Sequence, residues 1–203
     1  MDDPRTTWNS RWREKADDSW VPDPWLLRVR PMLPYGRALD IACGRGRNAL
    51  YLAEQGMSVT ALDVSEEALA QLAAEAARRN LPVETRRVDL EATPQLSVNA
   101  YDLVLEFFYL HRPLLPQLLE AVRPGGIVVL RTFSRAGSFS GGPDNPDFVL
   151  RPGELLEIFA GWEVLLHEEG MEPSRKGGSL AGIVARRPAL AAETENSGIA
   201  GKE

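Results

Sequence analysis

The chain has 203 residues, the size of one ordinary domain, and can bury a hydrophobic core without disulfides or a structural metal. Its formal net charge of −6 argues against nucleic-acid binding, which requires a basic face. A single cysteine, Cys43, excludes an intrachain disulfide and a cysteine zinc site. No stretch approaches the ~20 apolar residues of a membrane span, and no apolar run follows the polar N-terminus. We therefore expect a cytoplasmic protein, monomeric or homodimeric, with no metal and no membrane partner.

The N-terminal residues 1–30 hold four of the five tryptophans among charges and prolines. Tryptophans this dense usually pack against something, so we expect an arm that packs on the main domain, with Trp25 in a structural role. The main domain is expected over 31–187. The Ala/Gly/Glu-rich tail, 188–203, is expected to be disordered.

Apolar segments with strand and helix periodicity alternate along the main domain. Such alternation predicts a mostly parallel sheet with helices on both faces. Strands are expected at 38–42, 58–63, 83–88, 101–105 and 127–131, and helices at 48–54, 66–79, 113–122 and 152–159. Strands at 162–167 and 180–186 are expected to form an antiparallel hairpin at the edge of a seven-stranded sheet. Residues 134–150 are interpreted as a long mobile loop, of the kind that often serves as a lid.

A glycine turn after the first strand, Asp40–Asn48, lets a ligand approach the backbone. Such turns also serve NAD and FAD, so a nicotinamide-dependent oxidoreductase is one alternative. Asp40 precedes the first glycine, where it would repel a pyrophosphate but attract an ammonium group. Asp63 ends the second strand and suits a ribose diol, while Asp89 ends the third and suits the adenine amine.

These segments, together with 101–104 and 123–126, resemble the successive motifs of class I methyltransferases that use S-adenosylmethionine (SAM). They cover about 37–131. Within that superfamily the chain is similar to the tellurite-resistance and thiopurine methyltransferase-like group, through 8–12, 148–155 and 161–163. It departs from the tellurite enzymes in having no histidine within 171–179.

The resemblance implies a Rossmann-like fold, SAM as cofactor and a small-molecule methyl acceptor. It places one group of residues along the cofactor: Trp12, Asp40, Ala42, Cys43, Gly44, Gly46, Asn48, Asp63, Val64, Asp89, Leu90 and Glu106. The arm 1–30 would cap this site through Trp12. Cys43 is interpreted as a small residue beneath the cofactor and not as a nucleophile.

Catalytic candidates lie after the fourth strand, at the side where open α/β sheets place their chemistry. His111 or Tyr109 would take a proton from an alcohol or amine, whereas a thiol or soft anion needs no base. Phe107, Arg131 and Arg135 are candidates for contact with the acceptor. A noncatalytic SAM-binding regulator on the same fold is the second alternative.

Overall fold

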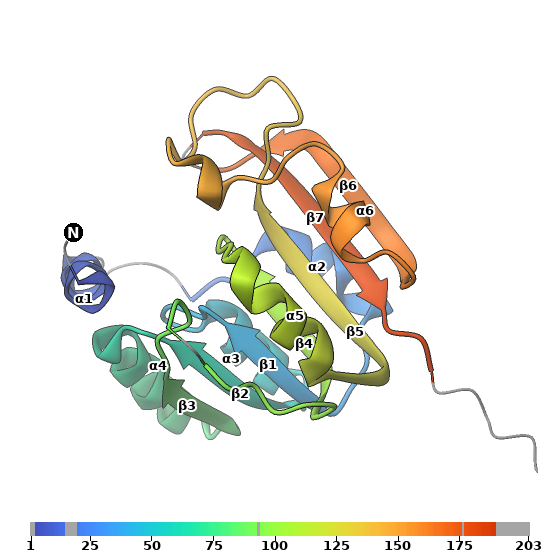
Figure 1. Cartoon of the computed structure of the whole chain (residues 1–203). Coiled ribbons are helices and arrows are strands. Elements are labelled where there is room, and N and C mark those ends of the chain that lie inside the picture. Colours follow the sequence, from blue (N-terminus) through green and yellow to red (C-terminus); the bar gives the residue numbers. More distant parts are fainter. Residues whose placement is uncertain (1–2, 15–19, 93, 176, 190–203) are drawn as a thin grey trace, which may run out of the picture.

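A seven-stranded sheet forms the centre of the protein and is covered by helices on both faces (Figure 1). The computed structural model describes residues 3–14, 20–92, 94–175 and 177–189. Of the expected disordered tail, all but the first two residues lie outside these ranges. The helices are α1 (Pro4–Glu14), α2 (Pro24–Val29), α3 (Arg47–Glu54), α4 (Glu66–Arg79), α5 (Leu115–Ala121) and α6 (Glu154–Ile158), with 3-10 turns η1 (Arg30–Met32), η2 (Arg112–Leu114) and η3 (Pro146–Phe148). The strands are β1 (Arg37–Ile41), β2 (Ser58–Asp63), β3 (Val83–Arg87), β4 (Tyr101–Phe107), β5 (Val122–Phe133), β6 (Glu163–Pro173) and β7 (Ser179–Arg186).

The strand order is β3-β2-β1-β4-β5-β7-β6. Strands β1 to β5 pair in parallel, and β7 pairs antiparallel with both β5 and β6. This confirms the predicted Rossmann-like sheet with a C-terminal antiparallel hairpin. None of the helices in the described ranges has the length and apolarity needed to cross a bilayer.

Alternating side chains of the central strands build two hydrophobic cores. On β4, Leu103 and Leu105 join the core under α2, α3 and α4, while Val104 joins the core under α5 and α6. Every residue of β4 is buried, as expected for a parallel strand covered on both faces. Helix α4 begins where the sequence predicts, because the Ser65 hydroxyl accepts a hydrogen bond from the amide of Ala68.

Strands β5 and β6 extend farthest beyond the ranges that the sequence suggested. Strand β5 already begins at Val122 and so includes Arg123–Gly126, which precede the strand expected at 127–131. The register against β4 shifts between Tyr101 and Leu103, so the glycines lie in a bulge of the strand. Strand β6 continues to Pro173 because its outer half still pairs with β7.

The loop 134–150 is fastened by its backbone to the connection between β6 and β7. The amide of Gly178 donates to the carbonyl of Ser140 at 2.7 Å. Gly137 lies so close to Gly170 that a Cβ on Gly137 would be 2.5 Å from the Gly170 carbonyl oxygen. Glycine is therefore required where the two segments touch. The mobility of this loop remains a prediction.

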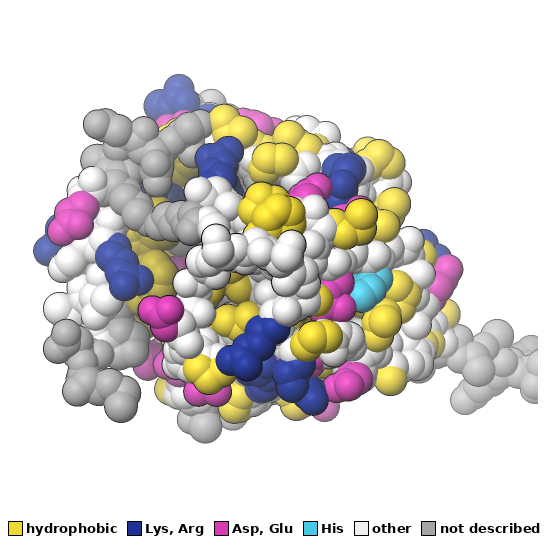
Figure 2. All heavy atoms as spheres, turned by 90° about the horizontal axis from the view of Figure 1, so that it is seen from above, with side chains coloured by type: hydrophobic (Ala, Val, Ile, Leu, Met, Phe, Trp, Pro, Cys, Tyr) yellow, Lys and Arg dark blue, Asp and Glu magenta, His cyan; other side chains and the backbone are white. Residues whose placement is uncertain are grey.

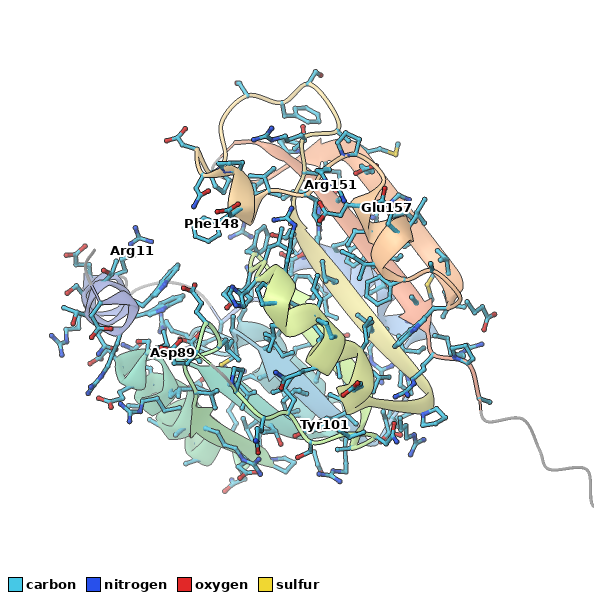
Figure 3. The ribbon with its side chains drawn as sticks, viewed as in Figure 1. Arg11, Asp89, Tyr101, Phe148, Arg151 and Glu157 are labelled. Atoms are coloured by element: carbon cyan, nitrogen blue, oxygen red, sulfur yellow. The ribbon has the colours of Figure 1, made fainter. Side chains whose placement is uncertain are left out.

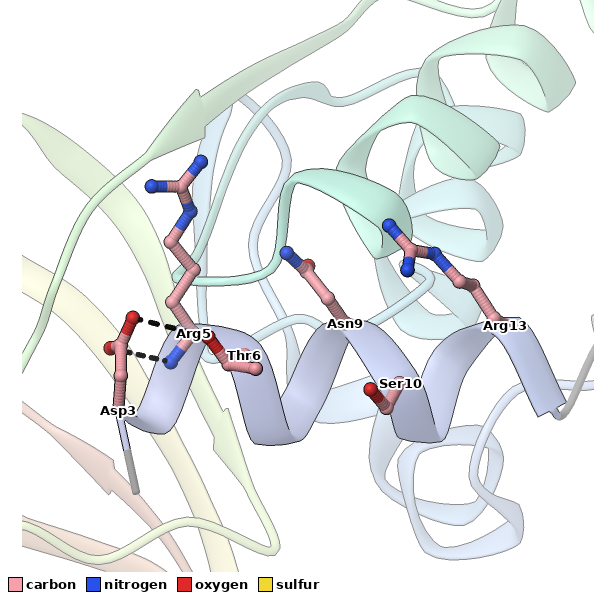
Figure 4. A pocket seen from close by; sticks show the side chains of 6 residues that line it. All are labelled: Asp3, Arg5, Thr6, Asn9, Ser10 and Arg13. Atoms are coloured by element: carbon pink, nitrogen blue, oxygen red, sulfur yellow. Dashed lines mark hydrogen bonds between the residues drawn. The ribbon is translucent and has the colours of Figure 1, made fainter. Parts of the chain in front are cut away.

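The N-terminal segment forms two helices that we did not predict. On α1, Arg5, Asn9 and Arg13 follow each other at intervals of four and project from one side of the helix (Figure 4). This side faces the beginning of α4. Asn9 accepts a hydrogen bond from the Ser65 hydroxyl at 2.7 Å, Arg5 pairs with Glu66 at 2.9 Å, and Arg13 pairs with Glu67 at 3.5 Å.

Helix α2 anchors the segment to the core through Trp25. The Asp23 carboxylate accepts the Trp25 amide at 3.0 Å and so caps the helix, and Pro24 begins it. The Trp25 indole is 3% exposed and lies directly on β7, where a Cβ on Gly182 would be 2.7 Å from the ring. Trp25 therefore has the structural role that we expected.

Replacing Trp25 with alanine should lower the free energy of unfolding by about 3–5 kcal/mol, because it removes a large buried ring from the core. Chemical denaturation would measure this loss. The matched control is Tyr35→Ala, whose ring is 68% exposed and whose removal should cost less than about 1 kcal/mol. Equal losses for the two variants would contradict the packing described for α2.

Candidate functional site

Three strand ends meet at the carboxyl edge of the sheet. Ile41 of β1 is paired with Leu62 of β2 on one side and with Glu106 of β4 on the other. The residues that follow β1 and β4, Ala42 and Phe108, have positive φ angles of 52° and 56°. This conformation costs free energy in residues other than glycine and is concentrated at functional sites. The edge of β1 and β4 is thus the first place to search for a site.

The glycine turn after β1 is tightly built. The Cys43 amide donates to the Leu62 carbonyl at 2.9 Å, which holds the turn against β2. Gly46 needs to be glycine, because its φ is 74° and a Cβ would lie 2.4 Å from Leu72 of α4. A Cβ on Gly44 would lie 2.7 Å from the ring of Trp12. The Trp12 indole of α1 therefore packs directly on the turn.

Asp63 links this turn to the end of β2. Its carboxylate accepts the Gly44 amide at 2.7 Å and the Ser65 amide at 2.9 Å, one on each oxygen. Each carboxylate oxygen has two lone pairs, so both can accept a further hydrogen bond. Burial raises the pKa of Asp63, and the amide hydrogen bonds oppose the rise. Val64, the next residue, is half-buried.

Asp40, the fourth residue of β1, is 2% exposed, and its Oδ2 has no hydrogen-bond partner among the described residues. Burial raises the pKa of Asp40 to about 7, and the nearby Asp63 adds to the rise. A buried carboxyl in this state is compensated when a positively charged group binds to it. Burial also raises the pKa of the Cys43 thiol, and the nearby Asp40 and Asp63 add to the rise. A reactive thiolate is therefore unfavourable at this position.

Glu106, at the end of β4, is the second buried acid whose hydrogen-bonding capacity is unused. It is 1% exposed, and neither carboxyl oxygen has a partner within the described ranges. Burial alone raises the pKa of Glu106 to about 8. The Tyr109 hydroxyl is also unpartnered there, and burial raises its pKa, with Glu91 and Glu106 adding to the rise. A phenol with a raised pKa stays protonated and is a poor proton acceptor.

The end of β3 lies beside Asp63, since the Val88 amide donates to the Asp63 carbonyl at 2.9 Å. Asp89 is exposed, and one of its oxygens accepts the Glu91 amide at 3.0 Å. Leu90 is buried. In Figure 3 Asp89 lies on the side of α4, whereas Phe148 comes from the loop beyond β5.

Asp23, which sequence reasoning missed, is the centre of a buried ion-pair cluster. Its carboxylate pairs with Arg47 at 3.0 Å and with Arg131 at 3.1 Å, and its amide donates to the Asn48 side chain at 2.9 Å. The other side of the Arg131 guanidinium pairs with Glu172 at 2.6 Å. Arg131 and Asn48, both expected at the ligand, thus hold the N-terminal segment on the sheet. The Asp-Pro pair that begins α2 is the only local signal for this cluster.

The remaining candidate residues differ in how far their side chains are exposed to solvent. Phe107 is 8% exposed and packs edge-on against Trp25 with ring centroids 6.3 Å apart, so its ring belongs to the core. Phe108 is the exposed member of the pair, at 38%. His111 is half-buried at the beginning of η2 and makes no side-chain capping bond. Arg135 is exposed, and no described residue is seen to pair with its guanidinium.

Comparison with known proteins identifies the family. The sequence profile of a methyltransferase domain matches residues 38–126. An uncharacterized methyltransferase from Synechocystis is 30% identical over 171 residues, which cover 75% of this chain and 76% of that protein. The chain belongs to the class I SAM-dependent methyltransferases. The probable SAM-dependent methyltransferase TehB of Haemophilus influenzae is 29% identical over 141 residues, 66% of this chain. This methyltransferase chain spans only about half the length of TehB, 49%.

Solved structures show the same fold. TehB from Haemophilus influenzae superposes with a TM-score of 0.73 at 22% identity, covering 89% of this methyltransferase and 67% of TehB. A structure described for the conversion of a disulfide bond into a thioacetal group during echinomycin biosynthesis superposes with a TM-score of 0.69 at 22% identity. That match covers 93% of this chain and 94% of the other.

The acidic side chains at the sheet edge fit a SAM molecule. SAM carries an ammonium group, a sulfonium group and a ribose diol. The methyltransferase offers two buried acids with free oxygens, Asp40 and Glu106, and a third, Asp63, with accepting capacity left on both oxygens. No described basic side chain is seen to pair with Glu106, so a cationic ligand is the natural complement of this edge.

Glu106→Gln should stabilise the ligand-free methyltransferase at alkaline pH. The pKa of Glu106 is raised in the folded protein, so its contribution to stability is full below the unfolded value and is lost as the pH rises toward 8. Because one pKa unit corresponds to about 1.4 kcal/mol, the variant should gain about 2 kcal/mol or more over the wild type at pH 8.5. At pH 4 the two proteins should be nearly equal.

Urea denaturation at both pH values would test this expectation. The control is Glu163→Gln, an exposed residue of β6 that should change stability little at either pH. A difference between wild type and Glu106→Gln that does not depend on pH would contradict the buried, unpartnered state of Glu106.

Proposed function

We propose that the protein transfers a methyl group from SAM to a small-molecule acceptor. The observation that carries this proposal is the group of acids Asp40, Asp63 and Glu106 on three adjacent strand ends, in a chain of the methyltransferase family. SAM supplies a sulfonium leaving group, so the protein's main tasks are to hold the acceptor in line and to exclude water.

In this proposal the cofactor extends from the glycine turn toward β3. Its methionine part lies along Asp40, the turn and Asn48, its ribose at Asp63 and Val64, and its adenine at Asp89 and Leu90. The turn contributes Ala42, Cys43, Gly44 and Gly46. Glu106 adjoins the methionine part from β4. Support comes from Asp63, whose carboxylate already bonds to both the turn and the residue after Val64.

The segment 1–30 would act as a cap over this site, and 31–187 as the methyltransferase domain. Two contacts support a capping role. Helix α1 docks on the beginning of α4, and Trp12 lies on Gly44 of the turn. An indole at this point can exclude water from a bound cofactor.

We propose that the acceptor is a thiol or another soft nucleophile. Such a nucleophile needs no strong base, and the raised pKa of Tyr109 makes this residue a poor one. Phe108, Phe139 and Phe148 are exposed and offer apolar contacts, and hydrophobic side chains reach the surface between charged ones in Figure 2. Sulfur chemistry also appears in the echinomycin enzyme.

The roles of the other candidates follow from their contacts. Arg131 is neutralised by two carboxylates, so Arg135 is the better partner for an anionic acceptor. His111 takes the proton if the acceptor is an alcohol or amine, since its side chain makes no capping bond.

Methyl transfer from labelled SAM to thiols, selenite, tellurite and small phenols tests the function. We expect product with at least one thiol and none from a protein that lacks the acids at positions 40 and 63. SAM binding without transfer to any acceptor would favour a noncatalytic SAM-binding protein. Absence of SAM binding would overturn the proposal.

Asp63→Asn should weaken SAM binding more than ten-fold, because it removes charge-assisted hydrogen bonds worth ~1.5–3 kcal/mol each. Calorimetric titration would measure the change. Asp144→Asn, in the exposed loop, is the control and should bind SAM like the wild type. An unchanged dissociation constant for Asp63→Asn would show that the ribose assignment is wrong.

A further inference from the structure

Two buried acids with free oxygens lie on opposite faces of the same sheet edge. Asp40 follows Leu39 on β1, and its side chain is on the face of α3. Glu106 follows Leu105 on β4 and points to the opposite face, with Val104, toward α5 and α6. Their strands are adjacent, since Ile41 pairs with Glu106. A ligand that spans this edge can therefore contact Asp40 on one face of the sheet and Glu106 on the other.

Among the described residues, no basic side chain compensates the buried carboxyl of Glu106, since burial alone accounts for its raised pKa. Tyr109 lies in the electrostatic reach of Glu106 and also of Glu91, Asp89 and Asp63. Arginines near this edge are engaged elsewhere. Arg47 and Arg131 pair with Asp23, and Arg112 pairs with Glu154 at 2.6 Å. The carboxylate form of Glu106 is therefore favoured only when a positive charge enters with a ligand.

SAM and its product S-adenosylhomocysteine (SAH) differ in one positive charge. Both carry the ammonium group, while only SAM carries the sulfonium. We propose that Glu106 recognises the sulfonium centre and lets the protein discriminate between SAM and SAH, while Asp40 meets the ammonium group that both share. This inference rests on the proposed function, because it assumes that SAM binds at this edge.

The affinity of the site therefore depends on whether the bound ligand carries the sulfonium charge. With SAM bound, the charge on Glu106 has a partner in a site shielded from water, where such an attraction is strong. With SAH bound, the carboxyl is again without a partner. Product is therefore held less tightly than the methyl donor.

Calorimetric titration at pH 7.5 with SAM, SAH and sinefungin tests the inference without any methyl acceptor. Sinefungin carries an amine-bearing carbon in place of the sulfonium and so keeps the charge. The wild type should bind SAM and sinefungin at least ten-fold more tightly than SAH. In Glu106→Gln, SAM and sinefungin should weaken at least ten-fold, whereas SAH should stay within three-fold of the wild type. Asp40→Asn is the matched control and should weaken all three ligands to a similar extent.

Equal affinities of the wild type for SAM and SAH would overturn the inference, and this measurement needs no variant. A ratio of SAM to SAH affinity that is unchanged in a folded Glu106→Gln would also overturn it. Should that variant fail to fold, Glu106→Ala and the sinefungin measurement on the wild type take its place. Absence of binding for all three ligands would instead overturn the proposed function, so the two failures are distinguishable.

Discussion

The parallel pairing of β1 between β2 and β4 is the constraint on which the site depends. It brings Asp40, Asp63 and Glu106 to one edge although they come from three separate strands. Side chains alternate along a strand, so a slip of β1 by one residue would turn Asp40 to the other face and end this arrangement. The two hydrophobic cores prevent such a slip, because it would also expose Leu39 and Ile41 to the wrong helices. The register of β1 thus determines both the packing of the cores and the geometry of the site.

This edge is assembled at the expense of local stability. Ala42 and Phe108 have backbone conformations that their side chains disfavour, and Asp40 and Glu106 are buried with carboxyl oxygens that no described residue hydrogen-bonds. Functional sites commonly break such rules, and the remainder of the fold compensates. Here the compensation comes from β4, buried over its whole length, and from Trp25, which closes the core over β7.

Much of the architecture could be predicted, because alternating strand and helix patterns and a glycine turn are local signals. Asp40 and Asp63 could be proposed as site residues for the same reason, since Asp40 lies just before the glycine turn and Asp63 ends a strand. The cluster around Asp23 was not, because its partners Arg47 and Arg131 are 24 and 108 residues away. The choice between Phe107 and Phe108 depends on a single left-handed residue, which sequence periodicity does not reveal. Helix α1 lacks buried apolar positions at regular spacing, so periodicity gave no sign of it.

The two N-terminal helices are held by different forces. Helix α2 is fixed by a buried indole and by an aspartate that is shielded from solvent, whereas the pairs between α1 and α4 involve arginine side chains that are 46% and 67% exposed. Dissolved salt weakens the attraction between exposed charges over a screening length that falls from about 10 Å at 0.1 M to about 3 Å at 1 M, but it affects buried pairs far less. Rising ionic strength therefore loosens α1 while α2 stays docked. Trp12, whose indole lies on the glycine turn, belongs to α1 and therefore to the helix whose attachment depends on salt.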